Sequence, residues 1–435
     1  MATRALIGLF GALVLVGCGG AGGGSGEVRF LLFGDPEEIG AYRELVGAFE
    51  EEAPDIGVQI IEASDRTDLI ARLSTSFAGG SPPDVFLLNY RYYGQFAARG
   101  VLEPLEERVQ SSDEFELADF YDVAIDAFRW EGELMCLPQN ISSLVVYYNV
   151  DLFEQYGGRK PHAGWTWNEM LGAAQALTVD SNGRPIRAGD PDAGGRTAAI
   201  YGLGVEPSLI RIAPFVWSNG GELVDDTERP TRLALDTPEA LTAVSEFLDL
   251  GIAYGVIPSD VEVEAEDDEA RFANGRLAML FSSRRSTPTF RTITDFEWDV
   301  APLPVHREPA GILHSDAYCM TKASERKDDA WRFIEFANSP EGQRIIARTG
   351  RTVPSLIEVS RSDAFLDPSA PPRSSHVFLD GVEHIRRVPT ISTWPEIEDA
   401  AAGVLENGLY LGQPAEQVVR ELDRVTRPLF ARAQR

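Results

Sequence analysis

The first ninety residues alternate between short apolar runs and amphipathic helical patterns, and this order constrains the fold more than any other feature. Residues 28–33, 58–61 and 84–88 form apolar runs of the length expected for buried strands. Between them, apolar residues recur at helical spacing over residues 42–49 and again over residues 69–77. A repeated strand, helix, strand order predicts a parallel sheet covered by helices.

Further along the chain, extended runs separated by helical patterns occur at residues 144–148, 277–281, 298–303 and 317–321. A last amphipathic helix is expected over residues 415–430. The length of 435 residues provides enough chain for two or three domains. Two α/β lobes with several extended crossings between them fit this order better than one continuous sheet.

The charge balance argues against polyanionic partners. Lys and Arg together number 39 and Asp and Glu 68, which gives a formal net charge of −29. Such a surface repels phosphate backbones and anionic lipid, so no nucleic-acid partner is expected. Almost all of the cations are arginines, so a single arginine is a weaker sign of bidentate recognition here than it usually is.

The N-terminus predicts an export signal. Arg4 precedes an apolar run at residues 5–16 that is too short to span about 30 Å of hydrocarbon. The LVGC sequence that follows resembles a bacterial lipobox, in which Cys18 is lipidated and becomes the mature N-terminus. We therefore expect a signal peptide over residues 1–17 and a flexible Gly/Ser tether over residues 18–26, with an ordinary secretory signal cut nearby as the alternative. The protein is expected to be exported, periplasmic or at the cell surface, with a lipid anchor on the membrane.

A series of short motifs follows the order and spacing of one protein family. They are residues 42–49 with 53–58, 80–85, 100–105, 137–138, 147–153, 166–169, 272–279, 301–304 and 339–343. Together they resemble the bacterial extracellular solute-binding proteins of carbohydrate ABC transporters, a maltose-binding-protein-like group. The resemblance covers essentially the whole mature chain.

This resemblance implies a periplasmic-binding-protein-like α/β fold of type II. In that fold two lobes are joined by multiple hinge crossings, and the solute is held in the cleft between them. The first lobe is expected over residues 27–138 and 282–315, and the second over residues 139–281 and 316–435. The resemblance also implies a non-enzymatic monomer that delivers a sugar or oligosaccharide to the permease subunits of an ABC importer. No cofactor and no metal are expected.

Several polar residues fall where the family contacts its solute. Asp35 follows the first predicted strand at the position of a sugar-contacting Asp, with a carboxylate that caps a helix as the alternative. Asn140 and Ser142 occupy the first crossing, where hinge hydrogen bonds are the alternative. Tyr318 on a crossing strand and Arg351 before a loop that often borders the cleft are further candidates.

Sugar recognition also needs aromatic faces that stack on the apolar side of a pyranose. Tyr92 follows the third predicted strand, at the carboxyl end where ligands of α/β sheets usually lie. Trp394 matches an aromatic sugar-stacking position late in the family. Trp217 is a further candidate, with packing inside the second lobe as the alternative.

One departure from the family pattern changes the expected chemistry. Where many relatives follow a short strand with a Gly and a stacking Trp, this chain has Arg284 and Arg285. Two arginines can pair with a carboxylate or a phosphate, so an anionic solute such as a uronate oligosaccharide or a glycerol phosphate is the alternative ligand. A neutral sugar remains the first expectation.

The motifs G-x-S-x-G, H-E-x-x-H, C-x-x-C and G-x-x-x-x-G-K-[ST] do not occur in the sequence, and the histidines lack ligand spacing. Residues 17–22 spell G-x-G-x-x-G, but no strand precedes them and no amphipathic helix follows, so a dinucleotide site is not expected there. Carboxylate pairs carry no information among 68 acidic residues, so an exported carbohydrate-active enzyme remains a rival interpretation. Cys136 and Cys319 both fall near predicted crossings. In an exported protein they could form a disulfide or stay as two separate buried thiols, and the sequence leaves both open.

Overall fold

The computed structural model of the chain describes residues 26–156, 158–188 and 196–433. The expected signal peptide, Cys18 and the tether up to residue 25 lie outside these residues. Within the described ranges, no helix combines the length and the apolar character that crossing a membrane requires.

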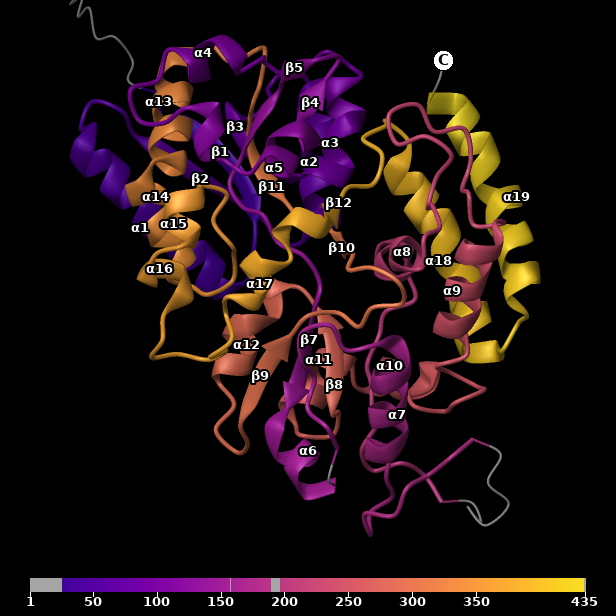
Figure 1. Cartoon of the computed structure of the whole chain (residues 1–435). Helices are drawn as coiled ribbons and strands as arrows, with labels where there is room; N and C mark the ends of the chain where they lie inside the picture. The colour runs from indigo at the N-terminus through magenta and orange to yellow at the C-terminus, as the bar shows by residue number, and fades with distance from the viewer. Residues whose placement is uncertain (1–25, 157, 189–195, 434–435) are drawn as a thin grey trace, which may run out of the picture.

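A five-stranded sheet forms the core of the first lobe, in the upper part of Figure 1. Its strand order is β2 (Val58–Ala63), β1 (Val28–Phe33), β3 (Val85–Asn89), β11 (Asp316–Met320) and β6 (Cys136–Pro138). β1 pairs in parallel with β2 and β3, whereas β11 runs antiparallel to both β3 and β6. Helices α1 (Pro36–Glu52) and α2 (Arg66–Ala78) connect the parallel strands, which confirms the order predicted for the first ninety residues.

Helix α1 illustrates how the sequence builds this lobe. The Asp35 carboxylate caps the helix by accepting a hydrogen bond from the Glu38 amide at 3.0 Å. Pro36 suits the first turn because a proline lacks the amide hydrogen that would have no acceptor there. The apolar face of α1 then packs on the sheet, where the ring of Tyr42 lies 5.8 Å from that of Phe30 on β1.

The other elements of the first lobe surround the same sheet. Helices α13 and α14 pack against α1. The bounds of these elements are α3 (Tyr90–Ala97), α4 (Glu106–Gln110), α5 (Asp122–Ala127), β4 (Arg129–Trp130), β5 (Glu133–Leu134), α13 (Lys327–Asn338), α14 (Pro340–Ala347), α15 (Ile357–Ser360) and α16 (Asp363–Leu366), with a 3-10 turn at Leu117–Asp119.

A three-stranded antiparallel sheet forms the core of the second lobe, in the lower part of Figure 1. Its central strand β7 (Val145–Asn149) pairs with β8 (Met279–Ser282) and β9 (Trp298–Ala301). The helices α8, α9, α18 and α19 pack on one another beside this sheet, at the right of Figure 1. The remaining elements are α6 (Val150–Tyr156), α7 (Trp167–Leu177), α8 (Leu209–Ser218), α9 (Pro238–Leu248), α10 (Asp260–Ala265), α11 (Asp268–Ala273), α12 (Thr287–Arg291), α17 (Val377–Asp380), α18 (Trp394–Leu411) and α19 (Ala415–Ala433), with 3-10 turns at Arg284–Ser286 and Val382–His384.

Several segments cross between the two sheets side by side. The backbone of Asn140 forms an antiparallel bridge with Pro354, and that of Ser142 forms one with His314. Nearby, the short strands β10 (Gly311–Ile312) and β12 (Ile385–Arg386) pair in parallel. Because neighbouring crossings are hydrogen-bonded to one another, the two lobes share a connection of several strands and not a single linker.

The structure corrects the expected division of the chain into lobes. Residues 316–320 form β11 inside the first sheet, and the helices of residues 327–347 pack on α1, so this stretch belongs to the first lobe. Residues 298–301 form β9 beside β7, so they belong to the second lobe. The periodicity of a run shows that it is a strand, but it does not show which sheet edge the strand will pair with. The C-terminal helices α18 and α19 both pack on α9 of the second lobe, and α18 also contacts α3 of the first.

The two cysteines left open by the sequence lie directly opposite each other. Cys136 on β6 and Cys319 on β11 are register partners, with their Cα atoms 4.3 Å apart, and they form a disulfide. The bond joins positions 183 residues apart in the sequence, across two strands of the first sheet. The disulfide therefore connects β11, which joins this sheet late in the sequence, to the earlier strand β6 of the same lobe.

Replacing both cysteines by alanine should lower the free energy of unfolding by about 2 to 5 kcal/mol, because the disulfide closes a long loop in the unfolded chain. Urea unfolding followed by circular dichroism measures this change. Wild-type protein reduced before unfolding is the control and should resemble the double variant. Equal unfolding midpoints for the variant and the oxidised wild type would contradict the expectation.

Candidate functional site

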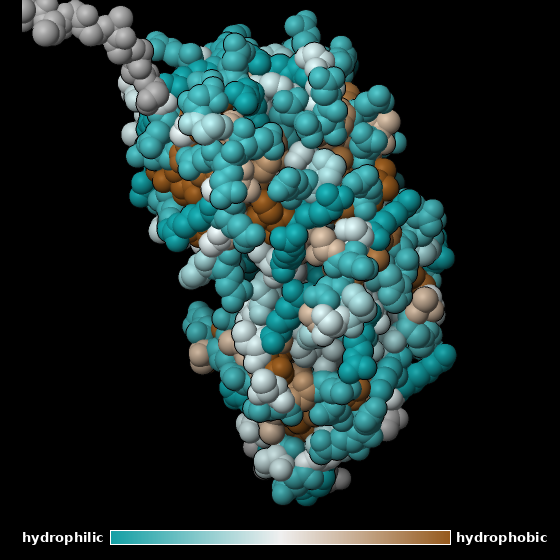
Figure 2. All heavy atoms as spheres, turned by 90° about the vertical axis from the view of Figure 1, so that its left-hand side faces the viewer, coloured by the Kyte–Doolittle hydropathy of each residue, from teal (hydrophilic) through white to brown (hydrophobic). Residues whose placement is uncertain are grey.

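A cavity of about 480 Å³ lies between the two lobes, beside the crossing segments. Its walls come from both lobes and from the crossings: Phe33, Glu38, Arg66, Leu87, Asn89, Arg91, Tyr92, Asn140, Ser142, Glu206, Ser208, Ile210, Arg211, Ser283, Arg285, His314, Asp316, Arg351, Thr352, Glu398, Asp399 and Ala402. Figure 2 shows a largely hydrophilic face that narrows between the upper and lower lobes. Because both lobes contribute to its walls, the shape of the cavity depends on how the two lobes are placed relative to each other.

The first-lobe wall lies where the parallel strands end. Phe33 ends β1, Asn89 ends β3, and Tyr92 lies in the first turn of α3 immediately afterwards. Carboxyl ends of parallel strands meet at one edge of a sheet, and the helices that follow them begin there. The sheet therefore brings side chains that are distant in sequence to a single edge facing the second lobe.

Glu38 and Arg351 form a largely buried ion pair on this wall. Nε of Arg351 lies 2.7 Å from Oε2 of Glu38, and another nitrogen of the same guanidinium pairs with Asp35. Burial raises the pKa of the Glu38 carboxyl to about 7; Arg351 opposes this rise, while Asp316 and Asp35 add to it. This corner of the cavity holds three carboxylates around one guanidinium.

An ion pair also connects the two lobes. Arg91 on α3 of the first lobe donates to Oε2 of Glu398 on α18 of the second lobe at 2.6 Å, and both side chains are buried. The indole nitrogen of Trp394 donates to the other oxygen of Glu398 at 2.7 Å, and Asn89 accepts from Nε of Arg91 at 3.3 Å. Neighbouring side chains hold both partners in place, so the ion pair fixes the position of α3 relative to α18.

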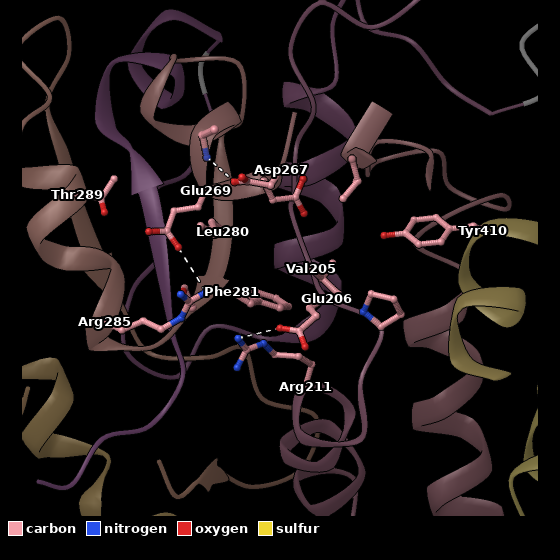
Figure 3. A pocket seen from close by; sticks show the side chains of 15 residues that line it. Val205, Glu206, Arg211, Asp267, Glu269, Leu280, Phe281, Arg285, Thr289 and Tyr410 are labelled. Atoms are coloured by element: carbon pink, nitrogen blue, oxygen red, sulfur yellow. Dashed lines mark hydrogen bonds and ion pairs between the residues drawn. The ribbon is translucent and has the colours of Figure 1, made fainter. Parts of the chain in front are cut away.

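The second-lobe wall carries two more arginines. Nη2 of Arg211, in the first turn of α8, lies 3.1 Å from Oε2 of Glu206, and Nη2 of Arg285 lies 3.4 Å from Oε2 of Glu269. An adjoining hollow of about 560 Å³ shares Glu206, Arg211 and Arg285 with the main cavity (Figure 3). Burial lowers the pKa of the His314 imidazole well below its usual value, and four arginines including Arg211 and Arg285 lower it further.

Five of the candidates from the sequence line the main cavity: Tyr92, Asn140, Ser142, Arg285 and Arg351. Asn140 also has the hinge role that was its alternative, because its side-chain oxygen accepts from the Asp316 amide at 3.0 Å. Asp35 lies beside the cavity through its contact with Arg351 and caps α1 as well. Asn140 and Asp35 therefore each have a structural role, in the hinge and in capping α1, and also lie at or beside the cavity.

Arg284 and Tyr318 do not reach the cavity, contrary to the expectation. The Arg284 guanidinium is fully buried, donates to the Gly350 carbonyl at 2.7 Å and lies 4.7 Å from the ring of Phe365. Tyr318 is fully buried in the first lobe, 5.8 Å from the ring of Phe30. Both arginines lie in the 3-10 turn at Arg284–Ser286, where successive side chains point about 120° apart, and Arg285 lines the cavity while Arg284 points into the core.

The two tryptophan candidates are also buried and line neither hollow. Trp217 lies inside α8, where Arg386 covers its ring at 4.8 Å. Trp394 is fully buried between α18 and α19, edge-on to Phe430 at 6.4 Å. Its contact with the cavity is indirect, because it positions Glu398 one helical turn later.

The sequence reasoning missed Glu38, Arg91, Arg211, His314 and Glu398. Arg91 was within reach, since it stands beside Tyr92 at the end of a predicted strand. The other four lie on separate elements that meet only in the folded chain, and no local pattern marks them. Among the residues that the structure describes, no group of three or more His, Cys, Asp or Glu side chains is arranged to hold a metal ion.

Two α/β lobes, joined by adjacent crossings and closed around a polar cavity, define a protein that encloses a solute between its lobes. The sequence model of the bacterial extracellular solute-binding protein family matches residues 44–372, and the chain belongs to this family. As its relatives are solute-binding proteins of extracellular type, the chain is of an exported class.

Relatives with assigned ligands and solved structures agree with this family. The chain is similar to a maltotriose-binding protein of Pyrococcus abyssi, at 23% identity over 77% of this chain and 68% of that protein. Among solved structures, an ABC substrate-binding protein of Listeria monocytogenes in complex with cycloalternan has a TM-score of 0.82 at 25% identity, covering 93% of this chain and 98% of that one. A maltose-bound MalE3 of T. maritima, at 23% identity, supports the fold, with a TM-score of 0.75 and coverage of 92% and 98%.

The pH dependence of stability should change when Glu38 is replaced by glutamine. A carboxyl whose pKa is raised from 4.5 to about 7 on folding stabilises the native state fully below pH 4.5, and this contribution is lost as the pH rises through 7. Between pH 4.5 and pH 8, Glu38→Gln should therefore gain up to about 3 kcal/mol in unfolding free energy relative to wild type. Urea unfolding at several pH values measures this gain.

Glu37→Gln is the matched control, since Glu37 is exposed in the same helical turn. Its unfolding free energy should run parallel to that of wild type over the same pH range. Parallel curves for Glu38→Gln as well would show that the Glu38 carboxyl does not titrate in this interval.

Proposed function

We propose that the protein is the substrate-binding component of an ABC importer, which captures a sugar or oligosaccharide between its lobes and delivers it to the permease. The observation that carries this proposal is the enclosed cavity to which both lobes contribute polar side chains. A solute that contacts both walls favours the closed arrangement over the open one, and closure then reports occupancy. The sugars named for the maltotriose-binding and cycloalternan-binding relatives support the same class of ligand.

The cavity offers the groups that a saccharide needs. The side-chain amides of Asn89 and Asn140 and the hydroxyl of Ser142 can pair with sugar hydroxyls. Tyr92 and Phe33 supply aromatic surface on the first-lobe wall. These residues come from the strand ends and the first crossing, so a bound sugar would lie against the hinge.

We further propose that the protein acts without catalysis and as a monomer. Four carboxylates around the cavity are committed to arginines: Glu38, Glu206, Glu269 and Glu398. An ion pair fixes the position of a carboxylate beside its arginine, which suits binding better than proton transfer. Turnover of a glycan by the purified protein would contradict this part of the proposal.

The leader supports a location at a membrane surface. In this proposal Cys18 carries the lipid anchor, and the Gly/Ser tether lets the folded part reach the permease. Export also fits the disulfide between Cys136 and Cys319, because disulfides persist in oxidising compartments.

Tyr92→Ala should weaken binding of a sugar ligand roughly ten-fold, because one aromatic stacking surface is lost. Isothermal titration calorimetry against a panel of neutral mono- and oligosaccharides measures the affinity. Tyr254→Ala is the matched control, since Tyr254 is half-buried and lines no part of the cavity. An unchanged affinity for Tyr92→Ala would place the sugar elsewhere.

Cys18→Ser should move the protein out of the membrane fraction, because the thiol that accepts the lipid is gone. Cell fractionation followed by immunoblotting measures the distribution. Gly22→Ser, which changes the tether and keeps the LVGC sequence, should remain with the membrane. A membrane-bound Cys18→Ser variant would contradict lipidation at this site.

A further inference from the structure

We propose that the solute carries an acidic group, a carboxylate or a phosphate, and that the start of α8 binds this group through Arg211, Ser208 and His314. This inference rests on the proposed function and specifies the ligand class of the same cavity. The three side chains line the main cavity together. They come from the second lobe and from a crossing, so the acidic group would sit opposite the sugar-binding residues of the first lobe.

Arg211 is the strongest reason for this assignment. The residue is 5% exposed, and its guanidinium reaches one carboxylate, Glu206, through Nη2. Nε and Nη1 of the same guanidinium are buried and have no hydrogen-bond partner. A buried donor without an acceptor costs about 1 to 3 kcal/mol, so a site that retains two of them is built for an acceptor from outside the chain.

Two further buried polar atoms belong to residues that line the cavity. Nε2 of His314 has no partner. The Ser208 hydroxyl makes no well-formed hydrogen bond, although Arg211 and this hydroxyl both lower the pKa of the Glu206 carboxyl. Among the side chains that the structure describes, four buried polar atoms of the cavity lining are therefore left without a well-formed hydrogen bond. A carboxylate or a phosphate has several lone pairs and can accept from a guanidinium and a hydroxyl at once.

The start of α8 adds a favourable electrostatic field. Ser208 is the N-cap of this ten-residue helix, but its side chain makes no capping hydrogen bond. Ser208, Ile210 and Arg211 all line the cavity, so the helix begins at its wall. The first turn of a helix presents amide hydrogens and partial positive charge, which together favour an anion.

The surrounding charges do not satisfy these donors. Arg91 and Arg285 line the same cavity. The Glu398 carboxylate is paired with Arg91 and the Glu269 carboxylate with Arg285, so neither is paired with Arg211. Glu206 is 57% exposed, so it neutralises Arg211 from the edge and leaves the buried face of the guanidinium open. Figure 3 shows Arg211 between Glu206 and Arg285, and all three residues line both hollows.

The small aromatic surface of the cavity also favours an acidic ligand. No tryptophan is among the residues that line it, and the described candidates Trp217 and Trp394 are buried elsewhere. The two aromatic rings that do line it, Phe33 and Tyr92, lie 5.6 Å and 5.3 Å from the guanidinium of Arg66. Charge-assisted hydrogen bonds are therefore better provided here than stacking faces.

Calorimetry with matched ligand pairs tests the proposal on the mature protein. The probes are trigalacturonate against galactotriose, glycerol 3-phosphate against glycerol, and inorganic phosphate alone. At least one acidic probe should bind about ten-fold or more tightly than its neutral partner, and Arg211→Gln should remove that advantage. Raising the salt concentration should weaken the acidic probe selectively.

The control is Arg373→Gln, which removes the same charge from a side chain that is 82% exposed and lines no part of the cavity. It should bind the acidic probe like wild type. Melting temperatures of the ligand-free variants check folding. If Arg211→Gln melts early, Ser208→Ala carries the same test with a smaller change.

The outcomes separate the two proposals. Equal binding of acidic and neutral partners, or an acidic preference that survives Arg211→Gln, overturns the acidic subsite and leaves sugar capture standing. Binding of glycerol 3-phosphate or inorganic phosphate that depends on Arg211, without binding of either saccharide, supports the subsite and contradicts sugar capture. No binding of any acidic probe, inorganic phosphate included, overturns the subsite. Whether the carboxylate or the phosphate probe responds identifies the source of the anion.

Discussion

The antiparallel return of β11 into the first sheet is the constraint on which the rest of this structure depends. The strand lies between β3 and β6 and so joins residues near position 318 to residues near positions 87 and 137. The segment that leads into it carries His314 and Asp316 to the cavity, and the backbone of His314 pairs with that of Ser142. The disulfide fastens the same strand to β6. Without this return, the hinge would lose one of its crossings and the cavity one of its walls.

Charge is distributed unevenly between the outside and the cavity. The chain carries a formal charge of −29, yet five arginines line the cavity. Four of them, Arg91, Arg211, Arg285 and Arg351, hold a carboxylate. Charges taken out of water need partners, and these pairs supply them while leaving donors of Arg211 unused. The acidic exterior keeps the protein from binding polyanions, whereas in the cavity lining the five arginines are matched by five carboxylates, Glu38, Glu206, Asp316, Glu398 and Asp399.

Local patterns were sufficient where one segment determines its own conformation. The run at residues 28–33 became β1, and the helical spacing at residues 42–49 became the buried face of α1. Tyr92 was found because the end of a parallel strand is a fixed place in an α/β sheet. The same reasoning assigned residues 316–320 to the wrong lobe, because the pattern of a strand does not show which sheet it joins.

The amino-acid sequence by itself determined the class of fold, the order of strands and helices in the first ninety residues, and the membership of a solute-binding family. Only the tertiary structure decided which large side chains reach the cavity. It buried Trp394 behind Glu398 and Arg284 against Phe365, and it brought Arg211, His314 and Arg91 to one cavity from three separate elements. The reason is physical: periodicity records which face of an element is apolar, whereas a binding site depends on how the faces of distant elements meet after packing.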